Sequence, residues 1–221
     1  MHPVLRLYED VLSSAEVLEF RLPPAPRMIF VVHGSASIGD KPVNAGETWH
    51  GEGATIVKPS PEGVTCWRWE LARGDSGSTT ASAPGMTTHE KLSAFLETIP
   101  KGPLLMRGDS VAFPPGGCAY THRHQGPGIR CMIEGGIRID THNRSTSYGP
   151  GGAWYETGPD PVFAQAAADK PSRFIRVMIL PRAWLGKSSI EYLKEEDKDK
   201  PKTQSYKVFV DAPISFEAKK S

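Results

Sequence analysis

The apolar residues of this chain fall in short runs, and turn residues interrupt them at intervals of about eight to twelve positions. In the first half the runs span 28–32, 35–38 and 63–71, and the rhythm returns at Leu104 and continues to about Leu180. The 22 glycines and 20 prolines are scattered between the runs. Short apolar runs bounded by Gly and Pro are typical of strands in β-sandwiches and barrels, so the pattern predicts an all-β chain.

Two segments depart from this strand rhythm. Residues 73–88 have almost nothing to bury, which predicts a linker or long loop. The apolar residues that follow recur at helical spacing and predict a short amphipathic helix over 89–99: Leu92, Phe95, Leu96 and Ile99. The C-terminal part is polar apart from one expected strand over Tyr206–Val210.

The two halves of the chain resemble each other. With Gly34 placed on Gly135, residues 28–34 lie over 129–135, 46–50 over 151–155, and 64–71 over 173–180. An internal repeat fixes architecture, so we expect two copies of one barrel in tandem. The expected boundaries are a first barrel at 1–72, a linker and short helix at 73–100, a second barrel at 101–182 and a C-terminal arm at 183–221.

Composition narrows the class of protein. A chain of 221 residues suffices for two domains of about 100 residues each. The net charge is +1 with no clustered basic run, which argues against nucleic-acid binding. No stretch reaches the roughly 20 apolar residues of a membrane span, and the start lacks the pattern of a signal peptide. Three cysteines cannot all pair, so we expect a cytoplasmic protein without a disulfide framework.

The chemistry of the chain concentrates around His122 and His124, which follow the Gly-rich turn at 115–117. Residues two apart on a strand face the same side, so both imidazoles would enter the barrel and could grip one ion. The same parity places Cys118 and Tyr120 on that side. The alternative is that the pair is exposed or structural.

Residues 115–135 resemble the first motif of the cupin superfamily. That motif is a glycine, five residues, His-x-His, a Glu four or five residues later, then six residues and another glycine; here Gly116 or Gly117, His122, His124 and Gly135 match it. Residues 148–156 resemble the start of the second cupin motif. The resemblance implies jelly-roll barrels, arranged as a bicupin, and a homodimer. It also implies one divalent ion (Fe, Mn, Ni or Zn) serving dioxygenase, isomerase or decarboxylase chemistry.

The metal-ligand set of the family is incomplete in this sequence. The glutamate slot holds Gly128 or Ile129, and the slot of the last histidine holds Val162. Stable metal sites use three or more protein ligands, so a replacement is required. The candidates are Glu134, which shares the parity of Gly128, and Glu156, either of which would act as third ligand or general base, together with Cys118. Each also has a structural alternative as a strand end, an exposed carboxylate or a small buried side chain.

Arg130 lies at the same parity as Met132 and Glu134. If this strand lines the pocket, Arg130 supplies a fixed cation suited to a carboxylate or an enediolate. The alternative is a salt bridge to Glu134 or Glu156. Tyr120, Met132 and Trp154 complete the expected ligand pocket.

The first half offers no comparable set, because Arg21-Leu22-Pro23 stands where the His-x-His would fall. Three functions stay open. One is a metal-assisted enzyme acting on a small anionic or oxygenated organic molecule, and another is a non-catalytic protein that binds or senses such a molecule. The third is a structural bicupin.

Overall fold

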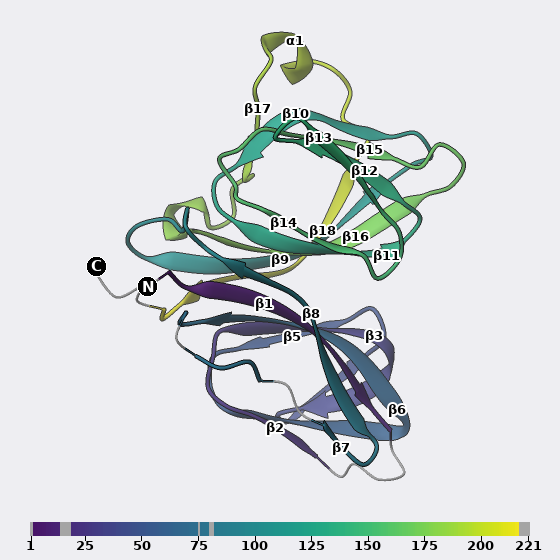
Figure 1. Ribbon diagram of the computed structural model, residues 1–221, viewed down its shortest axis with the longest axis vertical. Coiled ribbons are helices and arrows are strands. Elements are labelled where there is room, and N and C mark those ends of the chain that lie inside the picture. Colours follow the sequence, from purple (N-terminus) through teal and green to yellow (C-terminus); the bar gives the residue numbers. More distant parts are fainter. Residues whose placement is uncertain (1, 14–18, 75, 80–81, 217–221) are drawn as a thin grey trace. The chain divides into compact units, whose positions relative to one another are not determined.

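Strands make up almost all of the regular structure (Figure 1). The computed structural model describes residues 2–13, 19–74, 76–79 and 82–216. It divides the chain into two compact units, Met1–Leu96 with Ile214–Ser221, and Glu97–Pro213. No helix among the described residues is both long and apolar enough to span a bilayer. The prediction of an all-β chain is confirmed.

Unit 1 is built on one eight-stranded antiparallel sheet in the order β4-β3-β6-β1-β8-β7, with β2 paired to β6 and β5 paired to β3. The sheet bends round so that the long strand β6 pairs with β1, β2 and β3. Its strands are β1 (Val4–Leu12), β2 (Phe20–Leu22), β3 (Arg27–Ile38), β4 (Lys41–Asn44), β5 (Thr48–Gly51), β6 (Thr55–Ala72), β7 (Ser82–Ala83) and β8 (Met86–Phe95).

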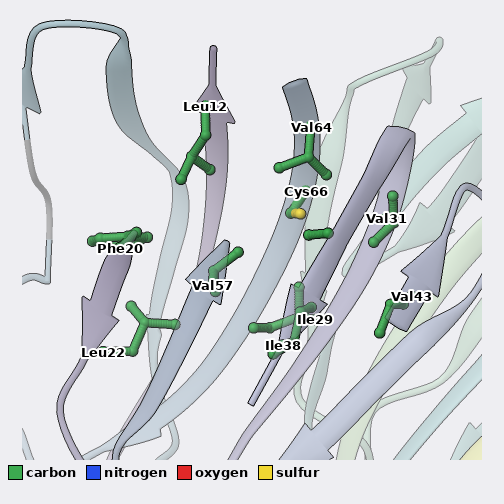
Figure 2. Packing of buried hydrophobic residues seen from close by; sticks show 11 residues of the cluster. Leu12, Phe20, Leu22, Ile29, Val31, Ile38, Val43, Val57, Val64 and Cys66 are labelled. Atoms are coloured by element: carbon green, nitrogen blue, oxygen red, sulfur yellow. The ribbon is translucent and has the colours of Figure 1, made fainter. Parts of the chain in front are cut away.

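Alternate residues of these strands form the hydrophobic core of unit 1 (Figure 2). Ile29 and Val31 of β3 meet Val64 and Cys66 of β6, and each of the four is at most 4% exposed. Side chains two apart on a strand share a face, so these residues lie on one face of β3 and β6. The other face is also buried over 27–31 and 66–71. Removing that apolar surface from water stabilises the unit.

The helix predicted over 89–99 is wrong, because β8 covers most of that range. β8 runs antiparallel to β1, with Val4 opposite Phe95 and Leu12 opposite Met86. Without β8, the β1 edge would present unpaired backbone N–H and C=O groups, and pairing outweighs the helical spacing of the apolar residues. Residues 75, 80 and 81 of the expected linker lie outside the described residues.

Unit 2 has two five-stranded sheets, in the orders β13-β12-β15-β10-β17 and β14-β11-β16-β9-β18. Its strands are β9 (Leu104–Phe113), β10 (Cys118–His124), β11 (Gly128–Glu134), β12 (Ile137–Thr141), β13 (Arg144–Tyr148), β14 (Ala153–Glu156), β15 (Val162–Ala166), β16 (Ser172–Pro181), β17 (Ile190–Tyr192) and β18 (Ser205–Ile214). A 3-10 turn, η1 (Arg182–Trp184), and a single helical turn, α1 (Glu195–Lys198), lie in the C-terminal segment.

The predicted repeat is present in the strand pairing of both units. The pairings β5-β3-β6-β1-β8 of unit 1 recur as β14-β11-β16-β9-β18 in unit 2. Gly34 lies within β3, where its register on β6 shifts, and Gly135 directly follows β11; their φ angles are +72° and +79°. A Cβ at these glycines would lie 2.2 Å from the Gly63 oxygen and 2.3 Å from the Pro171 oxygen. Only glycine fits both the backbone and the space, which explains the shared position.

Candidate functional site

A small cavity inside unit 2 brings together four of its buried polar side chains: His122, His124, Arg130 and Arg176. Its volume is about 20 Å³, which is enough for roughly one water molecule. Half of its lining is polar and half apolar: His122, His124, Arg130, Glu156, Arg176 and Tyr206, with Phe113, Ala119, Ile139, Ala164, Phe174 and Ile190. The cavity therefore combines a polar site with an apolar wall.

His122 and His124 both enter this cavity from β10, and each is 5% exposed. Their Nε2 atoms lie 3.2 Å apart. The strand parity that predicted this pair does not extend to Tyr120, because the β10–β15 register shifts between Ala119 and His122. The shift places Ala119 on the cavity side, while Tyr120 lies outside the lining, 5.0 Å from the Lys200 amine.

Both imidazoles are neutral at pH 7, because burial lowers the pKa of His122 and lowers that of His124 well below the ordinary value. His122 Nδ1 donates to the Tyr120 carbonyl at 2.7 Å, so its Nε2 presents a lone pair to the cavity. His124 Nε2 lies 3.4 Å from Arg176 Nη1, and a guanidinium can only donate. His122 Nε2 is therefore a hydrogen-bond acceptor at the cavity.

Glu156 and Arg130 form an ion pair at the cavity wall, with Oε2 and Nη2 separated by 2.7 Å. The contact is close but is not aligned as a hydrogen bond, so neither atom is fully satisfied. Trp154 Nε1 donates to the other carboxylate oxygen at 2.8 Å, and Arg130 Nη1 donates to the Gly128 carbonyl at 2.7 Å. Burial lowers the pKa of Arg130 to about 10, which leaves it charged at pH 7.

Arg176 and Asp109 are parts of the site that sequence reasoning missed. Arg176 donates to both Asp109 oxygens, at 2.9 and 2.7 Å, and both side chains are buried. Burial opposes the charge, but Asp109 outweighs it and raises the pKa of Arg176. One signal was available, since a charge in the middle of an apolar strand is seldom buried without a partner. Ile190 and Tyr206 of the C-terminal arm, which also line the cavity, had no such signal.

The remaining predicted residues lie around the cavity without lining it. Glu134 does not face it, because a register shift between Met132 and Glu134 turns the strand; it is 54% exposed and bonds Arg173 at 2.7 Å. Met132 packs in the hydrophobic core of unit 2 beside Trp154. Trp154 contacts two residues of the cavity lining, through its hydrogen bond to Glu156 and its ring contact with Phe174.

The described residues of the first barrel do not repeat the histidine pair. The strand registers place Leu22 of β2, opposite Thr55, at the position of His122, opposite Val162. By strand pairing the equivalent of Arg176 is Arg68, which faces Ile29 as Arg176 faces Arg130. The predicted alignment of 64–71 with 173–180 is therefore displaced by one residue.

Arg68 is saturated by groups of its own unit. It bonds both oxygens of Asp10, the Thr79 hydroxyl and Glu70, and it is fully buried. It therefore has a structural role.

The residues of the second barrel do not fit a resident divalent ion. The two Nε2 atoms have the spacing of neighbouring ligands, about 3.0 to 3.4 Å for bonds near 2.1 Å. Glu156 Oε2 is 3.7 Å from His124 Nε2, but it is held by Arg130, and Arg176 faces the same nitrogen. Among the described residues, no three His, Cys, Asp or Glu side chains are grouped to hold a metal.

Comparison with solved structures identifies the fold, although no family model and no curated protein matches the sequence. AerE from Microcystis aeruginosa aligns with a TM-score of 0.57 and 14% identity over 81% of this chain and 88% of AerE. A mutant of Bacillus subtilis oxalate decarboxylase, a cupin protein, aligns with a TM-score of 0.58 and 13% identity over 90% of this chain and 80% of that chain. The chain has the bicupin fold. At 13–14% identity this likeness shows the fold alone. The activity of this chain has to be inferred from its own residues.

Proposed function

We propose that the second barrel of this bicupin binds a small anionic or oxygenated organic molecule, as a binding or sensing protein. The observation that carries the proposal is a pair of guanidinium nitrogens, Arg130 Nη2 and Arg176 Nη1, at the cavity. The first has no well-aligned acceptor among the described residues, and the second has only the 3.4 Å contact with His124. Underused charged donors of this kind suit a carboxylate.

The acceptors beside these donors define the rest of the ligand. His122 and His124 present neutral nitrogens, and one Glu156 oxygen lacks a well-formed hydrogen bond. Glu156 and Asp109 already balance the charges of the two arginines, so an anionic ligand has to enter together with a proton. A molecule with a carboxylate and a hydroxyl would satisfy donors and acceptors together, and its carbon skeleton would meet the apolar wall.

Binding of such a molecule requires the cavity to open, since about 20 Å³ is too small for it. Two lining residues, Ile190 and Tyr206, come from the C-terminal arm. β17 is a three-residue strand at the edge of its sheet. Short edge strands open at low free energy, so we place the entrance under this arm.

A thermal-shift titration in EDTA tests the proposal. Oxalate, acetate and a series of 2-hydroxy acids are the probes, and stabilisation of about 2.7 kcal/mol is expected at 100 times the Kd of a true ligand. Arg130→Met is expected to abolish the shift. Arg173→Met is the matched control, because it removes an exposed arginine that also pairs with a glutamate. No shift with any probe, or an equal shift in R130M, would count against the proposal.

The second candidate is the metal-dependent enzyme that the cupin resemblance implies. The observation in its favour is the 3.2 Å spacing of the two histidine nitrogens. Retention of one equivalent of iron, manganese, nickel or zinc, after purification without a nickel column, would favour this candidate. The same measurement on His122→Ala shows whether the ion is held at this site.

A further inference from the structure

Arg130 holds the carboxylate that a metal ion would need. Among the residues that the structure describes, Glu156 is the acidic side chain that lines the cavity with the histidines. Its Oε1 is fixed by the Trp154 indole, and its Oε2 lies 2.7 Å from Arg130 Nη2. A cation that bound the histidines would have to take this oxygen from the arginine.

Charge distinguishes Arg130 from the other arginine of the cavity. Arg176 is neutralised by two hydrogen bonds to Asp109, which is not part of the cavity lining. Among the described residues, the carboxylate in direct contact with Arg130 is Glu156. If Glu156 moved to a metal, Arg130 would be left as an uncompensated buried charge beside a divalent cation, which is strongly unfavourable.

We infer that Arg130 is the residue that excludes a divalent metal from this barrel, by occupying Glu156 and by its own charge. The two histidines already have the spacing of metal ligands, and Glu156 lies 3.7 Å from one of them. Removing the guanidinium therefore leaves two neutral imidazoles and a free carboxylate round one small cavity. Two histidines and one carboxylate form a ligand set that divalent transition metals accept.

Co²⁺ is the probe for the test, because its visible absorption reports coordination directly. The full chain is purified without a nickel column, treated with EDTA and titrated with Co²⁺ alone at pH 7.5. We expect Arg130→Met to bind one equivalent at least 100-fold more tightly than the wild type. Arg130→Lys keeps the charge and is expected to bind as weakly as the wild type.

Two controls test whether the gain in Co²⁺ affinity of R130M is specific to this cavity. Arg173→Met removes the exposed ion pair with Glu134 and is expected to leave Co²⁺ binding unchanged. The double variant R130M/H122A is expected to lose the gain. Circular dichroism tests whether R130M is folded. If R130M does not fold, Arg130→Gln replaces it, and the same gain in Co²⁺ affinity is expected.

Tight Co²⁺ binding by the wild type that depends on His122 would overturn the inference, as would a folded R130M without the gain. An equal gain in R173M would also overturn it. The result is separate from the ligand proposal, which is measured with organic acids in the absence of metal. Failure of the inference about metal exclusion therefore does not imply failure of the proposed binding of an organic acid, and the reverse also holds.

Discussion

The two neutral imidazoles make the stability of unit 2 depend on pH. Burial lowers the pKa of His122 and His124 in the folded state, so below about pH 6.5 the unfolded chain takes up protons that the folded chain does not. Unfolding free energy is then lost as pH falls, by up to about 1.4 kcal/mol per pH unit for each histidine. Denaturant unfolding at pH 7.5, 6.5 and 5.5 measures this slope.

His124→Gln removes one of these titrating groups and is expected to reduce the slope. The control is His142→Gln, since His142 has a side chain that is 60% exposed. An unchanged slope in H124Q would show that His124 is already charged in the folded protein. His50 of unit 1, whose pKa burial also lowers, contributes equally to wild type and variant.

Gly135 is expected to be intolerant of any side chain. Its φ of +79° and the close Pro171 oxygen predict that Gly135→Ala lowers the unfolding free energy by about 2 kcal/mol or more. Gly149→Ala is the control, because a Cβ there meets nothing within 4 Å. A near-neutral G135A would contradict the packing described here, and chemical denaturation of both variants decides it.

At the scale of strands, the sequence predicts well where alternation is regular and fails where a register shifts. Apolar alternation and the glycine repeat predicted the strands of both barrels. The parity argument predicts that His122, His124 and Arg130 face the inside of the barrel, and all three line the cavity. It misplaced Tyr120 and Glu134, because each lies beyond a β-bulge that the residue pattern does not reveal. The helix over 89–99 failed because β1 needed a partner.

Strand β17 is expected to open before the rest of its sheet. It pairs with β10 through three residue pairs, including Arg123 opposite Glu191, and that salt bridge is nearly half exposed. Hydrogen exchange with mass spectrometry should show faster exchange over 190–192 than over the central strand β16. Equal protection of the two strands would contradict the entrance proposed under the arm.

A disulfide staple tests whether this opening admits the ligand. Arg123→Cys with Glu191→Cys joins directly opposed positions of β10 and β17. A Cys118→Ser background removes the half-buried native thiol on the same strand. The oxidised staple is expected to slow the association of any acid found in the thermal-shift titration, and reduction should restore it. Unchanged association after complete oxidation would place the entrance elsewhere.

Across the whole chain, the two barrels use one arginine position in different ways. Arg68→Met would strand the buried carboxylate of Asp10, so we expect a loss of about 3–5 kcal/mol of unfolding free energy without effect on ligand binding. Arg123→Met, at an exposed pair, is expected to cost under about 1 kcal/mol. Equal costs for the two variants, in denaturant titrations, would contradict a structural role for Arg68.

The hydrogen bond from Trp154 to Glu156 gives the molecule an optical reporter of its own. Indole emission responds to the electric field and hydrogen bonding at the ring nitrogen, and this nitrogen donates to Glu156, whose carboxylate lines the cavity. Any species that draws Glu156 away, whether cobalt or an organic acid, should shift the fluorescence of this tryptophan. The chain has 5 tryptophans. Subtracting the emission spectrum of Trp154→Phe from that of the wild type isolates the signal of Trp154 from the signals of the others.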